Sequence, residues 1–104
     1  DDPAENPKWV AKWQARAKEL MAEPARCLLT RDDVSGRLGE ITCPALVVHG
    51  TKDTAITMEH AEEMAHDLVG CGGVVKVAGA HAANLTNPEP VNAAILDFLA
   101  GLPA

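Results

Sequence analysis

The chain has 104 residues and a formal net charge of −6, which limits it to one domain of modest size. This acidic balance argues against nucleic acid as a partner, because nucleic-acid binding depends on clustered Lys and Arg. Apolar residues make up 47% of the sequence and aromatic residues only 3%, so we expect a globular core of Val, Leu, Ile and Ala.

The three cysteines indicate neither a disulfide framework nor a metal site. Cys27, Cys43 and Cys71 are an odd number and show no CxxC or Cys/His ligand spacing. We therefore expect no metal, no cofactor and a reducing compartment. No apolar run approaches the roughly 20 residues that cross a membrane, and the acidic start lacks a signal peptide. These features predict a cytoplasmic protein without a membrane partner. Because the chain starts at Asp1 rather than Met, it is compatible with a fragment or a processed product.

Residues 1–30 are predicted to be a helical segment. Asn6-Pro7 is a typical helix start, with Asn as the N-cap and Pro at the first helical position. This helix is expected to end before Pro24, because Pro disrupts a helix interior. The apolar positions that recur at helical spacing are Trp9, Val10, Trp13, Ala17 and Leu20. The two Trp residues are expected to pack on the helix rather than to bind a ligand.

A second, shorter helix is predicted to begin at Thr30, because Asp33 follows three residues later in the pattern of a capping box. The apolar positions of this helix are Val34, Leu38 and Ile41. We place the boundary between the helical segment and an α/β unit at Thr30, so that residues 31–104 form the second segment.

Two short strands with a helix between them are predicted in the second segment. Residues 45–49 and 74–77 are apolar at nearly every position, which is typical of strands buried on both faces of a parallel sheet. The helix between them starts after Thr57, and a final helix starts at Asn87-Pro88 and ends near Gly101. The inward positions are Met58, Ala61, Met64, Ala65 and Leu68 in the first of these helices and Val91, Ala94, Ile95, Phe98 and Leu99 in the last. This order implies an α/β fold with a parallel crossover, and the unpaired edges of two strands require something else to extend the sheet.

Two titratable residues follow the two predicted strands. Asp53 lies in the loop after the first strand, and His81 follows the second strand through Gly79-Ala80. Reactive groups gather at the carboxyl ends of the strands in open α/β sheets. A carboxylate and an imidazole placed there can meet, and the Asp then fixes the His tautomer and stabilises the imidazolium formed on proton transfer. Asp53 and His81 are therefore the candidate catalytic residues. Taken alone, Asp53 is more often a turn former, and His81 could be a hydrogen-bonded loop residue.

Several linked motifs between residues 31 and 102 resemble the C-terminal third of α/β-hydrolases. They include an Ile-x-x-Pro-x-Leu-Val-Val-x-Gly strand, a Gly-x-x-Asp loop and a Gly79-Ala80-His81 turn, one residue shorter than the family's usual Gly-Ala-Gly-His. The most similar branch holds enol-lactonases, small esterases and cofactor-free haloperoxidases. The resemblance implies a partial α/β-hydrolase fold, with the last two parallel strands and their flanking helices. It also implies that residues 1–30 are the end of the family's cap region.

By this resemblance, Asp53 matches the acid of the catalytic triad and His81 matches its base. The implied function is that of a serine hydrolase acting on small esters or lactones. The family's nucleophile lies upstream in a G-x-S-x-G motif, yet Ser35 is the only serine and lacks the first Gly of that motif. No HGGG-type oxyanion segment is present either. We therefore expect the isolated chain to be inactive, with the missing N-terminal part of the hydrolase or a second copy of the chain as its partner.

Other polar residues have less specific settings. His49 ends the first strand and is expected to be a hydrogen-bonded structural residue, or else to line the site. His60 and His66 lie six residues apart among acidic residues and are expected to be solvated rather than metal ligands. Cys71 lies at the amino end of its strand, which argues against a substitute nucleophile. The alternative function is a non-enzymatic α/β unit that dimerises or exchanges elements to cover its sheet edges.

Overall fold

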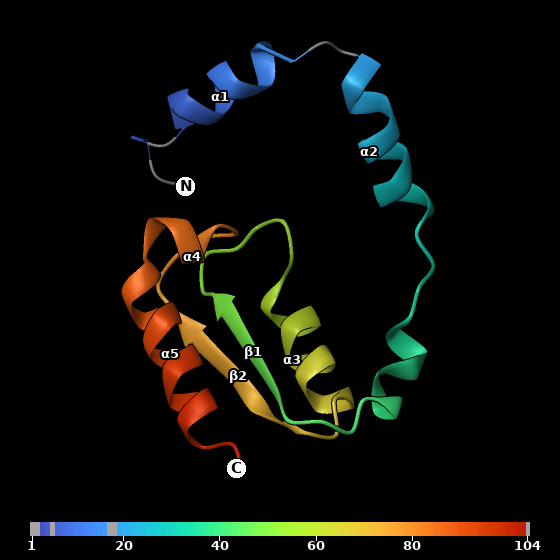
Figure 1. Cartoon of the computed structure of the whole chain (residues 1–104), viewed down its shortest axis with the longest axis vertical. Helices are drawn as coiled ribbons and strands as arrows, with labels where there is room; N and C mark the ends of the chain where they lie inside the picture. Colours follow the sequence, from blue (N-terminus) through green and yellow to red (C-terminus); the bar gives the residue numbers. More distant parts are fainter. Residues whose placement is uncertain (1–2, 5, 17–18, 104) are drawn as a thin grey trace. The chain divides into compact units, whose positions relative to one another are not determined.

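The chain divides into two compact units, Asp1–Val34 and Ser35–Ala104. The computed structural model describes residues 3–4, 6–16 and 19–103 (Figure 1). Within these described residues, no helix is long and apolar enough to cross a membrane. Among the residues described, the first unit holds only helices and the second holds the sheet. That residues 1–30 come from a cap region stays a prediction.

Two helices, rather than the single one predicted, occupy the described part of the first unit. Helix α1 spans Asn6–Gln14 and helix α2 spans Glu19–Thr30, with Pro24 inside α2. The expectation that Pro24 ends a helix is wrong, because Pro24 is the sixth of the twelve residues of α2, and the helix continues past it with one backbone hydrogen bond fewer. On α1, the rings of Trp9 and Trp13 contact each other with centroids 6.4 Å apart. Ala17, which was predicted in the first helix, lies outside the described residues.

The predicted capping box at Thr30 is also wrong. Thr30 is the last residue of α2, where its hydroxyl donates to the carbonyl oxygen of Arg26 at 2.9 Å, and the next helix starts only at Ser35, so Thr30 is not its N-cap. The short helix η1 is a 3₁₀ helix over Ser35–Glu40. Leu38 is half-buried against the core, whereas Val34 and Ile41 are exposed.

The sheet consists of two parallel strands, β1 over Ala45–Gly50 and β2 over Cys71–Val77. The parallel pairing and the position of β1 confirm the prediction, but β2 starts three residues earlier than expected. The early residues of β2 include two glycines, which weaken any strand signal in the sequence. Pairing of Cys71 with Ala45 extends β2 backwards despite that composition. Tertiary pairing here overrides local propensity.

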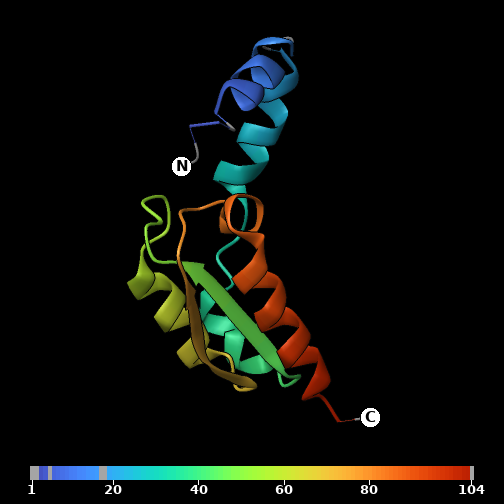
Figure 2. The same ribbon diagram turned by 90° about the vertical axis from the view of Figure 1, so that its left-hand side faces the viewer.

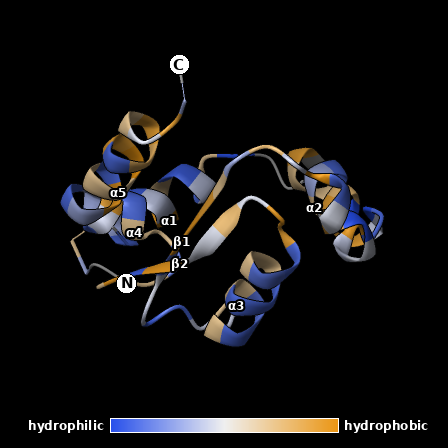
Figure 3. Ribbon diagram, turned by 90° about the horizontal axis from the view of Figure 1, so that it is seen from below, coloured by the Kyte–Doolittle hydropathy of each residue, from blue (hydrophilic) through white to orange (hydrophobic). Residues whose placement is uncertain are grey.

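Helices cover both faces of this sheet (Figures 2 and 3). Helix α3, Met58–Asp67, covers one face, and helices α4, Ala83–Thr86, and α5, Pro88–Ala100, cover the other. Val47 packs with residues of α3, whereas its neighbour Val48 packs beside residues of α4 and α5. This alternation is the period of two that a strand imposes on its side chains. The two core clusters are Val47, Ala61, Ala65 and Leu68 on one face and Val77, Ala83 and Val91 on the other.

The outer side of α5 and part of the sheet remain uncovered. Val91 is buried and Phe98 half-buried, as predicted, but Ile95 and Leu99 are exposed. Met64 of α3 is likewise exposed, although it was predicted to face inward. An open apolar groove of about 520 Å³ runs between the sheet and α5. It is lined by Leu46, Val75, Pro90, Ala93, Ala94, Asp97 and Phe98. The sequence therefore predicts more inward-facing apolar residues than a sheet of these two strands can bury.

Candidate active site

The loops that follow the two strands are joined by backbone hydrogen bonds. The amide of Thr51 donates to the carbonyl of Val77 at 2.9 Å, and the amide of Lys52 donates to the carbonyl of Gly79 at 2.8 Å. These two bonds continue the parallel ladder beyond the ends of β1 and β2. They hold the loop that carries Asp53 against the loop that leads to His81.

Gly50 makes this close approach possible. A Cβ atom at Gly50 would lie 2.5 Å from the carbonyl oxygen of Ala80 and 2.6 Å from that of Gly79, both of which are backbone atoms. Gly79 itself has a φ of +152° and would place a Cβ 2.9 Å from the Cβ of Ala83. Both positions therefore need glycine for steric reasons.

Asp53 and His81 meet across these loops. The Oδ2 atom of Asp53 lies 2.9 Å from Nδ1 of His81, while Oδ1 accepts hydrogen bonds from the amides of Ala55 at 2.9 Å and Ile56 at 3.1 Å. The side chain of Asp53 is 4% exposed and that of His81 is 66% exposed. The shorter turn before His81 thus still allows the contact with Asp53. Whether the pair is catalytic stays a prediction.

The hydrogen bonds around Asp53 favour its ionised form. Burial by itself raises the pKa of this carboxyl group, but the bond to His81 and the two backbone amides outweigh it and lower the pKa from 3.8 to about 2. Asp53 is therefore a carboxylate at neutral pH and accepts the hydrogen of Nδ1. In the neutral imidazole this leaves Nε2 as a hydrogen-bond acceptor.

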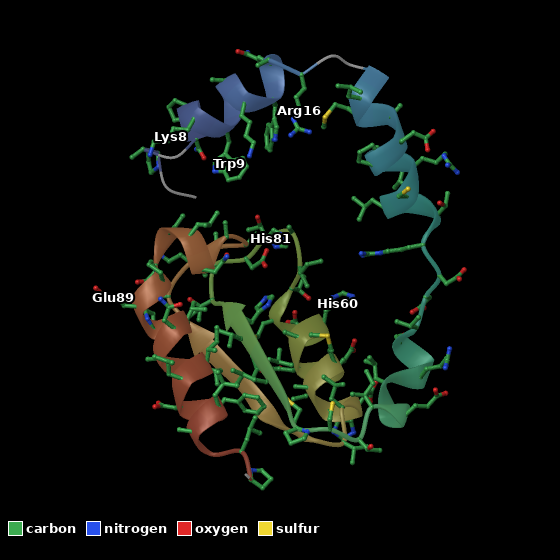
Figure 4. The ribbon with its side chains drawn as sticks, viewed as in Figure 1. Lys8, Trp9, Arg16, His60, His81 and Glu89 are labelled. Carbon is green, nitrogen blue, oxygen red and sulfur yellow. The ribbon has the colours of Figure 1, made fainter. Side chains whose placement is uncertain are left out.

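His81 stands at the carboxyl ends of the strands, at the rim of an open depression (Figure 4). The depression has a volume of about 330 Å³, and its lining includes His49, Asp53, Ile56, His81 and Asn84. No hydrogen bond of His81 Nε2 is present among the residues that the structure describes. That nitrogen can accept a proton from a group entering the depression.

The remaining candidates lie elsewhere. Ser35 starts η1, which packs beside α3 and precedes the amino end of β1, whereas Asp53 and His81 follow the carboxyl ends of the strands. Cys71 is the first residue of β2, at its amino end, and donates its thiol hydrogen to the carbonyl of Gly73. His60, labelled in Figure 4, and His66 are exposed on α3. Nδ1 of His60 lies 2.9 Å from the hydroxyl of Thr57. In the described parts of the chain, no group of three or more His, Cys, Asp or Glu residues could hold a metal ion.

Sequence reasoning missed how closely His49 belongs to this site. Its Nε2 lies 3.1 Å from the carbonyl oxygen of Ile56 and 3.9 Å from Oδ2 of Asp53. It also missed the amides of Ala55 and Ile56 as donors to Asp53. An Asp side chain commonly accepts hydrogen bonds from the amides two or three residues further along the chain. The sequence therefore does indicate these two donors.

The fold and the order of these motifs define the class of the protein. A parallel strand pair with helices on both faces is followed at its carboxyl ends by a Gly-x-x-Asp loop and a Gly-Ala-His turn. The chain belongs to the α/β-hydrolase superfamily and corresponds to its C-terminal portion.

Comparisons with known proteins also find hydrolases. The "Putative carbamate hydrolase RutD" of Escherichia coli K12 is 32% identical over 110 residues, which cover 90% of this chain but only 41% of RutD. The same holds for RutD of Escherichia coli SE11. The crystal structure of a hydrolase from Pseudomonas aeruginosa PA01 matches 67% of this chain and 26% of its own, with 31% identity and a TM-score of 0.60. No family profile matches the chain.

Proposed function

We propose that the chain supplies the acid and the base of a serine-type hydrolase that acts on small esters or lactones. The observation that carries this proposal is the 2.9 Å contact between Asp53 Oδ2 and His81 Nδ1. It lies at the carboxyl ends of the strands, where His81 lines an open depression and its Nε2 has no hydrogen-bond partner among the described residues.

In the proposed mechanism His81 moves the proton and Asp53 holds the ring. Nε2 of His81 takes the proton of a serine hydroxyl as that oxygen attacks the substrate carbonyl carbon. The same proton then passes to the leaving group, and a water repeats the sequence to release the acid. Asp53 stays ionised throughout and stabilises the imidazolium, in keeping with its lowered pKa.

The nucleophile and the oxyanion donors are proposed to come from outside these 104 residues. The sequence contains no G-x-S-x-G, and the chain spans 41% of the curated relatives it matches. We propose that a preceding part of the enzyme provides the serine and that the chain alone is inactive. The substrate class follows from chemistry that esters, lactones and carbamates share, which is an acyl carbon attached to a leaving oxygen or nitrogen.

A chimera tests this proposal. The chain would replace the matching 41% of RutD, and the purified product would be assayed with p-nitrophenyl acetate and with a fluorophosphonate that labels activated serines. We expect labelling and turnover in the chimera and neither in the isolated chain. His81→Ala should lower kcat by at least about 10³-fold, because the serine loses its base.

The matched control is His66→Ala, which removes an exposed histidine of α3. It should leave kcat within about twofold of the parent chimera, as is usual for surface changes. A chimera whose turnover and labelling survive His81→Ala would rule out the proposed role of this histidine.

A second candidate function is a non-enzymatic α/β unit that dimerises or exchanges elements. The observation that favours it is the uncovered apolar groove between the sheet and α5, next to a sheet of only two strands among the described residues. The oligomeric state of the isolated chain in solution distinguishes the two functions.

A further inference from the structure

A second histidine, His49, lies beside Asp53 and has no task in the mechanism above. It is the penultimate residue of β1, and its side chain is only 11% exposed. Its backbone pairs with Lys76 of β2, so the sheet fixes its position. It lines the same depression as Asp53 and His81. A nearly buried imidazole at such a place needs a hydrogen-bond partner.

That partner is the backbone of Ile56. Nε2 of His49 lies 3.1 Å from the carbonyl oxygen of Ile56. A carbonyl oxygen only accepts hydrogen bonds, so Nε2 carries the hydrogen and donates it. Because Nε2 is occupied in this way, it is not available to take a proton from an incoming hydroxyl. His49 is therefore not a rival to His81 as the base.

Ile56 connects His49 to Asp53 through both polar groups of its backbone. Its carbonyl accepts from His49, and its amide donates to Oδ1 of Asp53 at 3.1 Å. The Nε2 atom of His49 also lies 3.9 Å from Oδ2 of Asp53, the oxygen that faces His81. A continuous chain of hydrogen bonds thus leads from the paired strand to the carboxylate.

We propose that His49 is a positioning residue that holds the acid loop through Ile56, so that Oδ2 of Asp53 faces His81. The effect on turnover rests on the function proposed above, whereas the effect on the loop does not. Without this hydrogen bond, the carbonyl of Ile56 loses its tie to β1. The segment that carries the two amide donors can then move away from Asp53, and the carboxylate loses its fixed orientation.

Gln and Asn at position 49 separate this hydrogen bond from general packing. The amide nitrogen of His49→Gln can reach the place of Nε2, whereas that of His49→Asn is one methylene group too short. Hydrogen exchange of the Ala55 and Ile56 amides is measured by NMR in the chimera with RutD, which is expected to be monomeric. We expect rates within about twofold of the parent for His49→Gln and about tenfold faster for His49→Asn. Equal rates in the two variants, or equally faster exchange throughout β2, would overturn the proposal.

The chimera with RutD gives the catalytic readout. Per fluorophosphonate-reactive site, His49→Asn should lower kcat for p-nitrophenyl acetate at least about tenfold with KM within twofold, and His49→Gln should restore most of it. His66→Asn serves as the matched control. If His81→Ala abolishes turnover while His49→Asn leaves kcat unchanged, this inference fails and the proposed function stands. If turnover survives His81→Ala, the proposed function fails, and the exchange rates alone decide whether His49 holds the loop.

Discussion

Asp53 uses its two carboxylate oxygens for two different tasks. Oδ1 accepts the amides of Ala55 and Ile56 and so organises its own loop, while Oδ2 faces His81 across the sheet edge. The first set of bonds fixes the rotation of the carboxylate and thereby aims the second oxygen. The turn-forming and the proposed catalytic roles of this residue are therefore not alternatives, because each uses its own oxygen.

This arrangement predicts a pH dependence of stability. The folded-state pKa of Asp53, about 2, lies below the ordinary value of 3.8. A carboxyl group with a depressed pKa stabilises the fold fully above its ordinary pKa, and this contribution is lost as the pH falls through the folded-state value. We expect the urea midpoint of the chain to fall between pH 4 and pH 2, and to fall less in Asp53→Asn than in the parent.

The comparison of parent and variant removes the effect of the other carboxyl groups, which titrate in both. Asp67→Asn, at an exposed position of α3, is the matched control and should follow the parent curve. Identical pH dependence in the parent and in Asp53→Asn would contradict the hydrogen bonding described for Asp53.

Gly50 gives a second prediction at the residue scale. An Ala at this position would place its Cβ 2.5 Å from the carbonyl oxygen of Ala80, so the loop before His81 would have to move. We expect Gly50→Ala to lower the free energy of unfolding by about 1–3 kcal/mol and to weaken the Asp53–His81 contact. Urea unfolding measures the first effect, and turnover in the chimera measures the second. Gly72→Ala, where a Cβ would meet nothing within 4 Å, should be close to neutral.

At the scale of the elements, sequence patterns located those parts whose signals are local. The run of Val residues in β1, the apolar spacing of α3 and the Asn-Pro start of α5 led to correct elements. The errors arose where contacts between residues distant in the sequence determine the bounds or the presence of an element. Pairing with β1 drew Cys71 into β2 despite its glycines, and the short helix α4 follows a turn that no periodic pattern marks.

The candidate site shows the same difference between features with a local sequence signal and features without one. Parallel strands bring their carboxyl ends to one edge, so the proximity of Asp53 and His81 could be predicted from the order of strands and motifs. The contact of His49 with Ile56 could not be predicted, because the acceptor is a backbone carbonyl. Every residue type has this group, so the identity of residue 56 does not indicate the hydrogen bond. Local turn chemistry could have indicated the amides that bind Asp53, since they lie two and three residues ahead.

At the scale of the whole molecule, the apolar residues that were predicted to face inward exceed what this sheet covers. Ile95 and Leu99 are exposed on α5, and the groove beside that helix is lined mostly by apolar side chains. The need for further strands could be predicted from the unpaired edges, but the position of the groove depends on how α5 packs. In the proposed enzyme, the preceding part of the hydrolase covers this surface.

The last prediction concerns this groove in the isolated chain. Val75 lies in the groove and is partly exposed, so we expect the chain to bind 8-anilinonaphthalene-1-sulfonate and to form mixed oligomers that grow with concentration. Val75→Lys should reduce the dye fluorescence and the apparent mass measured by light scattering, because a charge in the groove opposes burial. Val69→Lys changes an exposed Val outside the groove and is the control. The chimera should be monomeric with little dye binding, since its remaining part covers the groove. A single well-defined dimer of the isolated chain, dissociated by Val75→Lys, would instead favour the non-enzymatic function, because a stable self-complementary surface would leave no need for the rest of a hydrolase.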